Sequence, residues 1–319
     1  MGTLWSASAP VGDRAAGCAA DSSCVAAALE VALDTVAALE RRLSNWSATS
    51  ELSRLNATGA ATVSEPLHAV LDSARSLAEL TGGAFDPSVE SLTLAWDLRG
   101  SGRTPSAAAL AAARKALGWQ RLSLERDRAR LDGVRIDLGG IAKGFALDRA
   151  ADVLAARGVD RAALDAGGQR LVAGGSPCSV WVARPDDRDA PAVCLLIADG
   201  SLSTSGQSER SLSAGGRRIG HVLEPSTGRP VETRASVSVL ARSGTRADAL
   251  STALLVMGRE RARAFAGRHP ELGVLWLEPA GARVVAEAWN LEIAAAAPFV
   301  HSNAGHRLSL HPKLLARNP

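Results

Sequence analysis

The amino-acid sequence predicts an α+β protein in which helices and strands are interleaved. Segments with apolar residues at helical spacing, such as 24–43 and 67–78, occur in the same chain as short apolar or alternating segments, such as 180–183 and 236–240. A contiguous G-x-G-x-x-G unit, which would favour a Rossmann fold, is absent from the sequence. We therefore expect a mixed fold rather than a doubly wound parallel sheet.

Length and composition fit one large domain or two fused lobes. The chain has 319 residues, of which 46% are hydrophobic and 22% charged, enough to bury a sizeable core. The formal net charge of +3 is small for this length and gives no electrostatic reason to expect a nucleic-acid partner. No apolar run approaches the roughly 20 residues of a membrane-spanning helix, so we expect no transmembrane segment.

The first half of the chain is predicted to be mainly helical. Apolar residues at helical spacing predict the helices, glycines and charged residues end them, and a proline in the favoured first position opens one of them. In chain order, the expected elements are a short strand at 5–9, helices at 24–43, 67–78 and 104–117, and a hairpin of 122–124 with 130–134.

The second half is predicted to contain more strands. Short apolar segments bounded by small residues have the pattern of buried strands, and one segment alternates cleanly. The expected elements are a helix from 141 that stops at Gly158, strands at 162–164, 180–183, 193–197 and 236–240, a small-residue loop at 201–206, a helix at 245–257, and a last strand pair at 273–277 and 283–286.

The four cysteines form two locally spaced pairs, Cys18 with Cys24 and Cys178 with Cys194. Disulfides between them would suit an oxidising compartment, and free thiols fit the spacing equally well. The N-terminus has neither a basic start nor a long apolar core followed by a small-residue cleavage site, so no secretory signal is visible in the sequence.

The most informative stretch is IDLGGIAKGFALD at 136–148, where a strand stops and a helix starts. Gly139 and Gly140 allow a sharp turn, and the first helical N–H groups after it have no partner within the helix, so an anion fits there. Lys143 would add a positive charge, and Asp137 could accept from a ribityl hydroxyl, an amide or a metal-bound water. An ordinary tight turn with solvated Lys and Asp side chains is the alternative.

Together with four other segments, this stretch resembles the ApbE family of Mg-dependent FAD:protein FMN transferases. The resemblance runs in the family's order from about Met1 to Met257. The other matching segments are SELSRLN at 50–56, TGGAFDP at 81–87, HVLEPSTGRP at 221–230 and ADALSTAL at 247–254.

The resemblance implies an ApbE-like α+β fold with the nucleotide site between two lobes. It implies an ApbE-like flavin transferase domain over 1–300, with a polar tail at 301–319 that lacks any period. It also implies that FAD is bound by Met1, Trp46, Ala84, Phe85, Asp86, Asp137, Lys143 and Val222. For Trp46 the alternative is a plain packing role, and for Asp86 an ordinary turn before Pro87.

Asp248 and Thr252 lie four residues apart on a predicted helix, so their oxygen atoms share one face and could reach one cation. Mg²⁺ prefers such oxygen ligands and usually takes only one or two protein carboxylates. The family resemblance adds the main-chain carbonyl of Gly140 and a main-chain contribution near Ser251. The alternative is a surface Asp with a Thr that bonds back to its own helix.

In the reaction that the resemblance implies, a Ser or Thr hydroxyl of a target protein attacks the phosphorus on the riboflavin side of FAD, and AMP leaves. His221 is the best candidate base at neutral pH, and Asp248 is the second. Glu224 replaces a common Asp in the segment that contains His221, and Gln169 also stands where an Asp is common. An Mg-dependent pyrophosphatase that hydrolyses FAD to FMN and AMP, or a non-catalytic FAD-binding protein, would fit the same motifs.

The acceptor implied by the resemblance is an exported flavoprotein with a Ser or Thr near an Asp and a Gly-Ala step. Family members usually carry a signal peptide or lipoprotein signal ahead of a Met-Gly-Thr segment, which here is 1–3. We therefore expect a periplasmic or cell-envelope location, or a cytoplasmic one if Met1 is the native start.

Overall fold

The computed structural model describes residues 3–11, 21–175, 177–207, 211–214 and 217–302. Within these residues the main sheet has eight strands in the order β1-β5-β6-β9-β14-β15-β16-β18, and its strand pairs are antiparallel except for parallel β16–β18. The strands are β1 (Trp5–Ser8), β5 (Ala162–Ala166), β6 (Gln169–Ala173), β9 (Gly200–Gly206), β14 (Ser236–Ala241), β15 (Gly273–Ala280), β16 (Arg283–Trp289) and β18 (Val300–Ser302).

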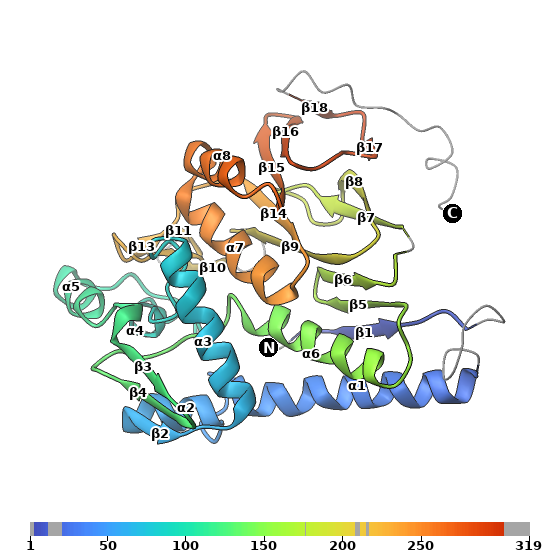
Figure 1. Cartoon of the computed structure of the whole chain (residues 1–319). Coiled ribbons are helices and arrows are strands. Elements are labelled where there is room, and N and C mark those ends of the chain that lie inside the picture. The colour runs from blue at the N-terminus through green and yellow to red at the C-terminus, as the bar shows by residue number, and fades with distance from the viewer. Residues whose placement is uncertain (1–2, 12–20, 176, 208–210, 215–216, 303–319) are drawn as a thin grey trace.

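Helices cover one face of this sheet and a small sheet covers the other (Figure 1). Successive side chains of β15 point to opposite faces of the sheet. Val274 and Trp276 pack against the helices on one face, and Leu275 and Leu277 pack in a second core on the other. The helices are α1 (Ser22–Leu43), α6 (Ala142–Ala156), α7 (Gly244–Met257) and α8 (Arg259–Arg268), and the small sheet consists of β7 (Cys178–Ala183), β8 (Pro191–Ile197) and β17 (Ala295–Ala296).

The segment between α1 and α6 forms a second group of elements beside the main sheet (Figure 1). It contains α2 (Glu51–Thr58), α3 (Glu65–Leu80), α4 (Glu90–Ala95), α5 (Ala107–Lys115), the 3₁₀ turn Trp119–Arg121, and the sheet of β2 (Ala60–Thr62), β4 (Arg128–Leu131) and β3 (Leu122–Glu125). Two hairpins lie against it, β10 (Ser211–Ala214) with β11 (Arg217–Gly220) and β12 (Leu223–Glu224) with β13 (Arg229–Pro230). A small core joins Leu92, Trp96 and Ala113 of this group to Ile219 of β11 and Leu223 of β12. The mixed α+β fold is confirmed.

Several details differ from the sequence-based expectations. The small-residue segment 201–206 is not a loop but strand β9, which pairs with β14 along 201–206 and with β6 along 200–202. Pro105 does not open α5, because Ser106 is the N-cap and its hydroxyl accepts from Ala109 N at 3.2 Å. Strand β18 ends at Ser302 and residues 303–319 lie outside the described part of the chain, so the expected domain boundary at 300 stays a prediction.

Among the described helices, α1 is long and apolar enough, by length and composition, to cross a membrane. Glu30 and Asp34 interrupt its apolar sequence, so the expectation of no transmembrane segment stays a prediction. The criterion is weak for a single helix, because core helices also meet it. One stripe of α1 is buried in the main core, and its residues are Val25, Ala28, Ala32, Val36, Leu39 and Leu43.

The cysteines differ in their redox state. Cys24, at the beginning of α1, is disulfide-bonded. Cys178 and Cys194 are free thiols. They lie on adjacent strands, but the strand register places Cys178 opposite Ile197 and Cys194 opposite Trp181. Cys18 lies outside the described residues.

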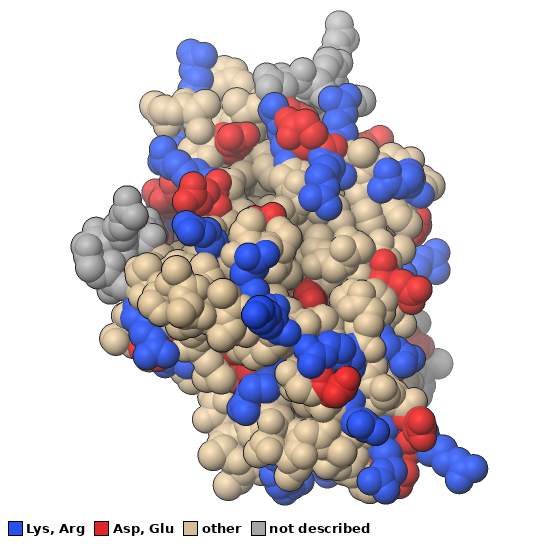
Figure 2. Space-filling model, turned by 90° about the vertical axis from the view of Figure 1, so that its left-hand side faces the viewer, with Lys and Arg blue, Asp and Glu red and all other residues tan. Residues whose placement is uncertain are grey.

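The surface carries both signs of charge. On the face drawn in Figure 2, Lys and Arg side chains are interspersed with Asp and Glu, in keeping with the small formal net charge of +3.

Candidate active site

The site is built on a close crossing of α6 and α7. A Cβ atom on Gly144 would lie 1.9 Å from the carbonyl oxygen of Gly244, so the two backbones meet without intervening side chains. One turn further along α6, Asp148 accepts hydrogen bonds from Ser243 Oγ (2.8 Å), Gly244 N (2.6 Å) and Thr245 N (2.9 Å). These bonds satisfy main-chain N–H groups at the beginning of α7 and hold that end of the helix against α6.

Asp248 lies on the next turn of α7 and is 2% exposed. Its Oδ1 accepts from Lys143 Nζ at 3.1 Å and from Ser203 Oγ at 3.4 Å, and its Oδ2 accepts from Gly144 N at 3.1 Å. Gly144 N lies in the first turn of α6, where main-chain N–H groups have no partner within the helix and favour a negative charge. The structure therefore brings Asp248 and Lys143 together at the beginning of α6, 105 positions apart in sequence.

The residues expected to bind a metal gather beside this carboxylate. A Cβ atom on Gly140 would lie 3.3 Å from Thr252 Oγ1 and 3.4 Å from Phe85 Cε2, so the glycine turn, α7 and the 81–87 segment meet there. The Ser251 hydroxyl donates to the carbonyl oxygen of Asp248 at 2.9 Å, and Thr252 does so at 3.4 Å. The back-bonding that we considered as the alternative for Thr252 is thus present, and it leaves the hydroxyl beside Gly140.

Strand β9 adds hydroxyl groups from the 201–206 segment, whose individual serines the sequence analysis did not name. Ser205 Oγ lies 2.8 Å from Ser251 Oγ and 3.2 Å from Thr252 Oγ1, and Ser203 reaches Asp248 as described above. Among the residues that the structure describes, no group of three or more His, Cys, Asp and Glu side chains could hold a metal ion. One buried carboxylate with hydroxyl and carbonyl oxygens nevertheless fits the chemistry of Mg²⁺, which needs few carboxylates.

Asp137 lies on the other side of the glycine turn and is held by three donors. Its Oδ1 accepts from Gly139 N at 2.7 Å, and its Oδ2 accepts from Arg99 Nη2 at 2.9 Å and from Thr93 Oγ1 at 3.2 Å. Arg99 also donates to Glu90, which is 3% exposed, and burial raises the pKa of Glu90 to about 7. The sequence analysis missed Glu90, Thr93 and Arg99, which lie on α4 or shortly after it.

Trp46 presents its ring to solvent near this cluster. Its side chain is 59% exposed, and Arg99 Cζ lies 6.0 Å from the ring centroid. The neighbouring Asn45 donates to the carbonyl oxygen of Ile136 at 2.8 Å, which attaches the Trp46 loop to the strand end before the glycine turn. An exposed aromatic face at this position is available for stacking.

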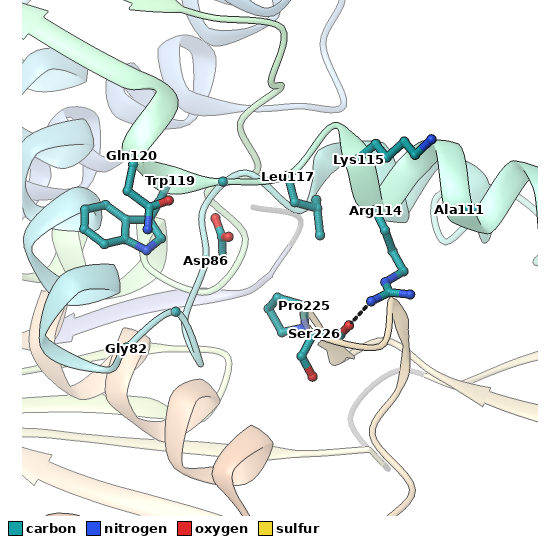
Figure 3. Close-up of a pocket in the computed structure, with 12 residues that line it drawn as sticks. Gly82, Asp86, Ala111, Arg114, Lys115, Leu117, Trp119, Gln120, Pro225 and Ser226 are labelled. Atoms are coloured by element: carbon teal, nitrogen blue, oxygen red, sulfur yellow. Dashed lines mark hydrogen bonds between the residues drawn. The ribbon is translucent and has the colours of Figure 1, made fainter.

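A pocket of about 580 Å³ lies beside the 81–87 segment (Figure 3). Asp86 lines it, and its Oδ1 accepts from Ser88 N at 2.8 Å and from Ser88 Oγ at 2.6 Å. Burial raises the pKa of the Asp86 carboxyl. Across the pocket, Arg114 donates to the carbonyl oxygen of Ser226 at 2.5 Å and so joins α5 to the 221–230 segment. The two residues before Asp86, Ala84 and Phe85, are buried.

The 221–230 segment is attached to the same strand that carries the site serines. Gln207, which follows β9, accepts from Val222 N at 3.1 Å and donates to the carbonyl oxygen of Val222 at 2.9 Å. His221 directly precedes Val222 and is half-buried. Glu224 accepts from Ser226 Oγ and Thr227 Oγ1, both at 2.9 Å, so it orders its own turn. Met1, the remaining expected FAD contact, lies outside the described residues.

Comparison with known proteins finds one family and consistent relatives. A family model described as the ApbE family matches residues 1–276. The protein named FAD:protein FMN transferase from Treponema pallidum (strain Nichols) is 32% identical over 283 residues, which cover 80% of this chain and 78% of the relative. The protein of the same name from Klebsiella pneumoniae (strain 342) is 30% identical over 281 residues, 82% of this chain and 78% of the relative.

Solved structures agree with these relatives. The ApbE protein from Thermotoga maritima has a TM-score of 0.73 and 31% sequence identity, and the match covers 79% of this chain and 86% of that one. The flavinyl transferase ApbE from Pseudomonas stutzeri, in its apo form, has a TM-score of 0.75 and 25% identity, with 91% and 98% covered.

Proposed function

Because the chain belongs to the ApbE family, it is a flavin transferase, and we propose that it transfers FMN from FAD to a Ser or Thr of a target flavoprotein in an Mg-dependent reaction. The bond formed is a phosphoester, and AMP is released. The observation that carries this proposal is the convergence of the buried Asp248 carboxylate with Lys143 Nζ and Gly144 N, both at 3.1 Å, beside Thr252 and the Gly140 turn.

The residues that would hold Mg²⁺ are Asp248, the Thr252 hydroxyl, the main-chain carbonyl of Gly140 and a group at Ser251. When bound, the ion would neutralise charge on the pyrophosphate oxygens. Lys143 adds a second positive charge on the same side, and the N–H groups at the beginning of α6 add partial charges. Catalysis would then consist mainly of positioning and charge neutralisation.

In the transfer step the acceptor hydroxyl oxygen forms a bond to the phosphorus of the FMN half. The bond from that phosphorus to the bridging oxygen breaks, and AMP leaves with the electron pair. We propose that His221 takes the hydroxyl proton. The Asp248 oxygens already accept from Lys143, Gly144 and Ser203, which makes His221 the better base.

The remaining site proposals place FAD between the main sheet with its helices and the α2–α5 group. Trp46 would stack on a ring of FAD, and Ala84, Phe85, Asp86, Asp137 and Val222 would contact the nucleotide, with Met1 as a further contact. The exposed Trp46 ring and the pocket beside Asp86 support this arrangement. We also propose that 1–300 form the flavin transferase domain.

The acceptor would be an exported flavoprotein segment with a Ser or Thr near an Asp. We propose that the protein works on the periplasmic or cell-envelope side. The disulfide at Cys24 supports this location, because disulfides persist in oxidising compartments.

The test is intact-mass spectrometry of a candidate acceptor domain after incubation with this protein, FAD and Mg²⁺. We expect a gain of one FMN unit that is lost without Mg²⁺ and with the Asp248→Ala variant. The matched control is Asp72→Ala, which removes a half-exposed carboxylate that pairs with Arg75, one turn away on α3, at 2.8 Å. Full transfer by a folded Asp248→Ala variant would contradict the metal assignment, and release of free FMN and AMP without a mass gain would identify a pyrophosphatase instead.

A further inference from the structure

Arg99 joins two residues that the family resemblance assigns to the flavin nucleotide, although it lies in none of the matching segments. Its Nη2 donates to Asp137 Oδ2 at 2.9 Å, and its Cζ lies 6.0 Å from the centroid of the Trp46 ring. Its Nη1 donates to Glu90 Oε1 at 2.7 Å, and its Nη2 also donates to Glu90 Oε2. One guanidinium therefore contacts a carboxylate and an aromatic side chain of the same site.

Stability alone is a poor explanation for this cluster. Glu90 is 3% exposed, and the side chains of Arg99 and Asp137 are 18% and 17% exposed. Removing such charges from water costs free energy that their mutual attraction repays only in part, and buried ion pairs can often be replaced by apolar residues without loss of stability. The raised pKa of Glu90 is a sign of that cost. What the cluster does provide is fixed geometry.

The arrangement of Glu90, Asp137 and Trp46 requires an arginine at this position, and another cationic side chain would not suffice. The planar guanidinium binds Glu90 with both terminal nitrogens and still directs one N–H to Asp137. Asp137 Oδ2 is thereby fixed by Arg99 and Thr93, while Oδ1 is fixed by Gly139 N in the glycine turn. A lysine ammonium at the same position is a point charge and cannot make the two-pronged contact with Glu90.

We propose that Arg99 is a positioning residue for the flavin nucleotide. Glu90 holds the Arg99 guanidinium, and the guanidinium sets the Asp137 carboxylate and the Trp46 ring in the arrangement that binds FAD. The inference rests on the proposed function, because it takes FAD as the ligand. It adds a residue pair, Glu90 with Arg99, that is separate from the metal-side residues on α7.

The test is a fluorescence titration of FAD against the full chain, without Mg²⁺ or acceptor, so that binding is measured apart from turnover. We expect Arg99→Met to raise the Kd for FAD by roughly 10-fold, because hydrogen bonds to charged groups are lost. Arg99→Lys should raise it by less, and Glu90→Gln, which keeps the arginine but neutralises its anchor, by about 3-fold. In turnover assays the KM for FAD should rise by a larger factor than kcat falls.

Arg259→Met is the matched control, because Arg259 pairs with buried Glu287 at 3.2 Å on α8 and β16, outside the site. It should change the melting temperature without changing the Kd for FAD. A folded Arg99→Met variant with the wild-type Kd overturns the proposal, and if that variant does not fold, a wild-type Kd for both Arg99→Lys and Glu90→Gln overturns it. If the wild-type chain binds no FAD even when Mg²⁺ is added, the proposed function fails as well.

Discussion

The crossing of α6 and α7 leaves no room for a side chain at Gly144, and this can be tested with Gly144→Ala. The added Cβ would lie 1.9 Å from Gly244 O and 2.8 Å from Thr245 N, which are main-chain atoms that cannot rotate away. Real Cβ contacts are essentially never shorter than 3.0 Å, so the helices would have to separate by about 1.1 Å. The same movement would stretch the bond from Gly144 N to Asp248 Oδ2, now 3.1 Å, to about 4 Å.

We expect Gly144→Ala to lower the free energy of unfolding by about 1–3 kcal/mol for overpacking, with about 1 kcal/mol more for the lost hydrogen bond. FMN transfer should fall by at least ~10-fold, because a displacement of about 1 Å in catalytic groups can cost ~100-fold. Urea denaturation gives the first quantity, and the intact-mass assay on the same preparation gives the second.

Gly267→Ala is the control, because it is expected to raise the free energy of unfolding, whereas Gly144→Ala is expected to lower it. Gly267 lies in the last turn of α8, and a Cβ atom there would meet nothing within 4 Å. Because alanine favours a helix over glycine, this variant should gain about 0.5–1 kcal/mol of stability and keep full transfer. A Gly144→Ala variant as stable and active as wild type would refute the close crossing and the role we give it in placing Asp248.

Two carboxylates near the site, the buried Glu90 and the half-buried Asp148, lead to further predictions. Burial raises the pKa of Glu90 from 4.5, its ordinary value, to about 7. The folded protein therefore binds this proton more tightly than the unfolded chain does. The resulting stabilisation is fully present below about pH 4.5 and is lost as the pH rises through 7. The unfolding free energy of wild type should therefore fall, relative to Glu90→Gln, by on the order of 2–3 kcal/mol between pH 4.5 and 8; parallel curves in denaturant titrations would contradict this. Asp148→Asn should destabilise the protein by about 1–3 kcal/mol, because an amide N–H₂ then faces the N–H and O–H donors of Gly244 and Thr245. An unchanged melting temperature in that variant would mean that Asp148 does not hold the beginning of α7.

Local sequence patterns were sufficient to predict the parts of the site that lie within one segment. The glycine turn before α6 follows from Gly139 and Gly140, and the shared face of Asp248 and Thr252 follows from helical spacing. Both patterns depend on residues no more than a few positions apart. The family resemblance then supplied their order along the chain, which periodicity alone does not give.

The parts that the sequence did not predict depend on contacts between distant segments. Ser203 and Ser205 lie in a segment of small residues that was expected to be a loop, yet pairing with β6 and β14 makes the segment a central strand. Arg99 lies 38 positions from Asp137 and showed no local pattern. Such pairings are decided by tertiary packing, and a single sequence shows no sign of them.

The ion pair between Lys143 and Asp248 leads to a last prediction about how the ligands bind. Asp248 is almost fully buried, so its charge needs a partner, and in this structure that partner is Lys143 Nζ at 3.1 Å. If Lys143 turned to the phosphates of FAD, Asp248 would be left uncompensated unless a divalent cation arrived with the nucleotide. Binding of FAD and of Mg²⁺ should therefore be positively coupled, each raising the affinity for the other by the same factor. A factor of roughly 10 corresponds to a coupling of about 1.4 kcal/mol, and titration calorimetry in both orders would measure it. In Lys143→Met the coupling should shrink, because Asp248 then lacks its partner whether or not FAD is bound; equal coupling in that variant would show that Lys143 does not exchange between the carboxylate and the phosphates.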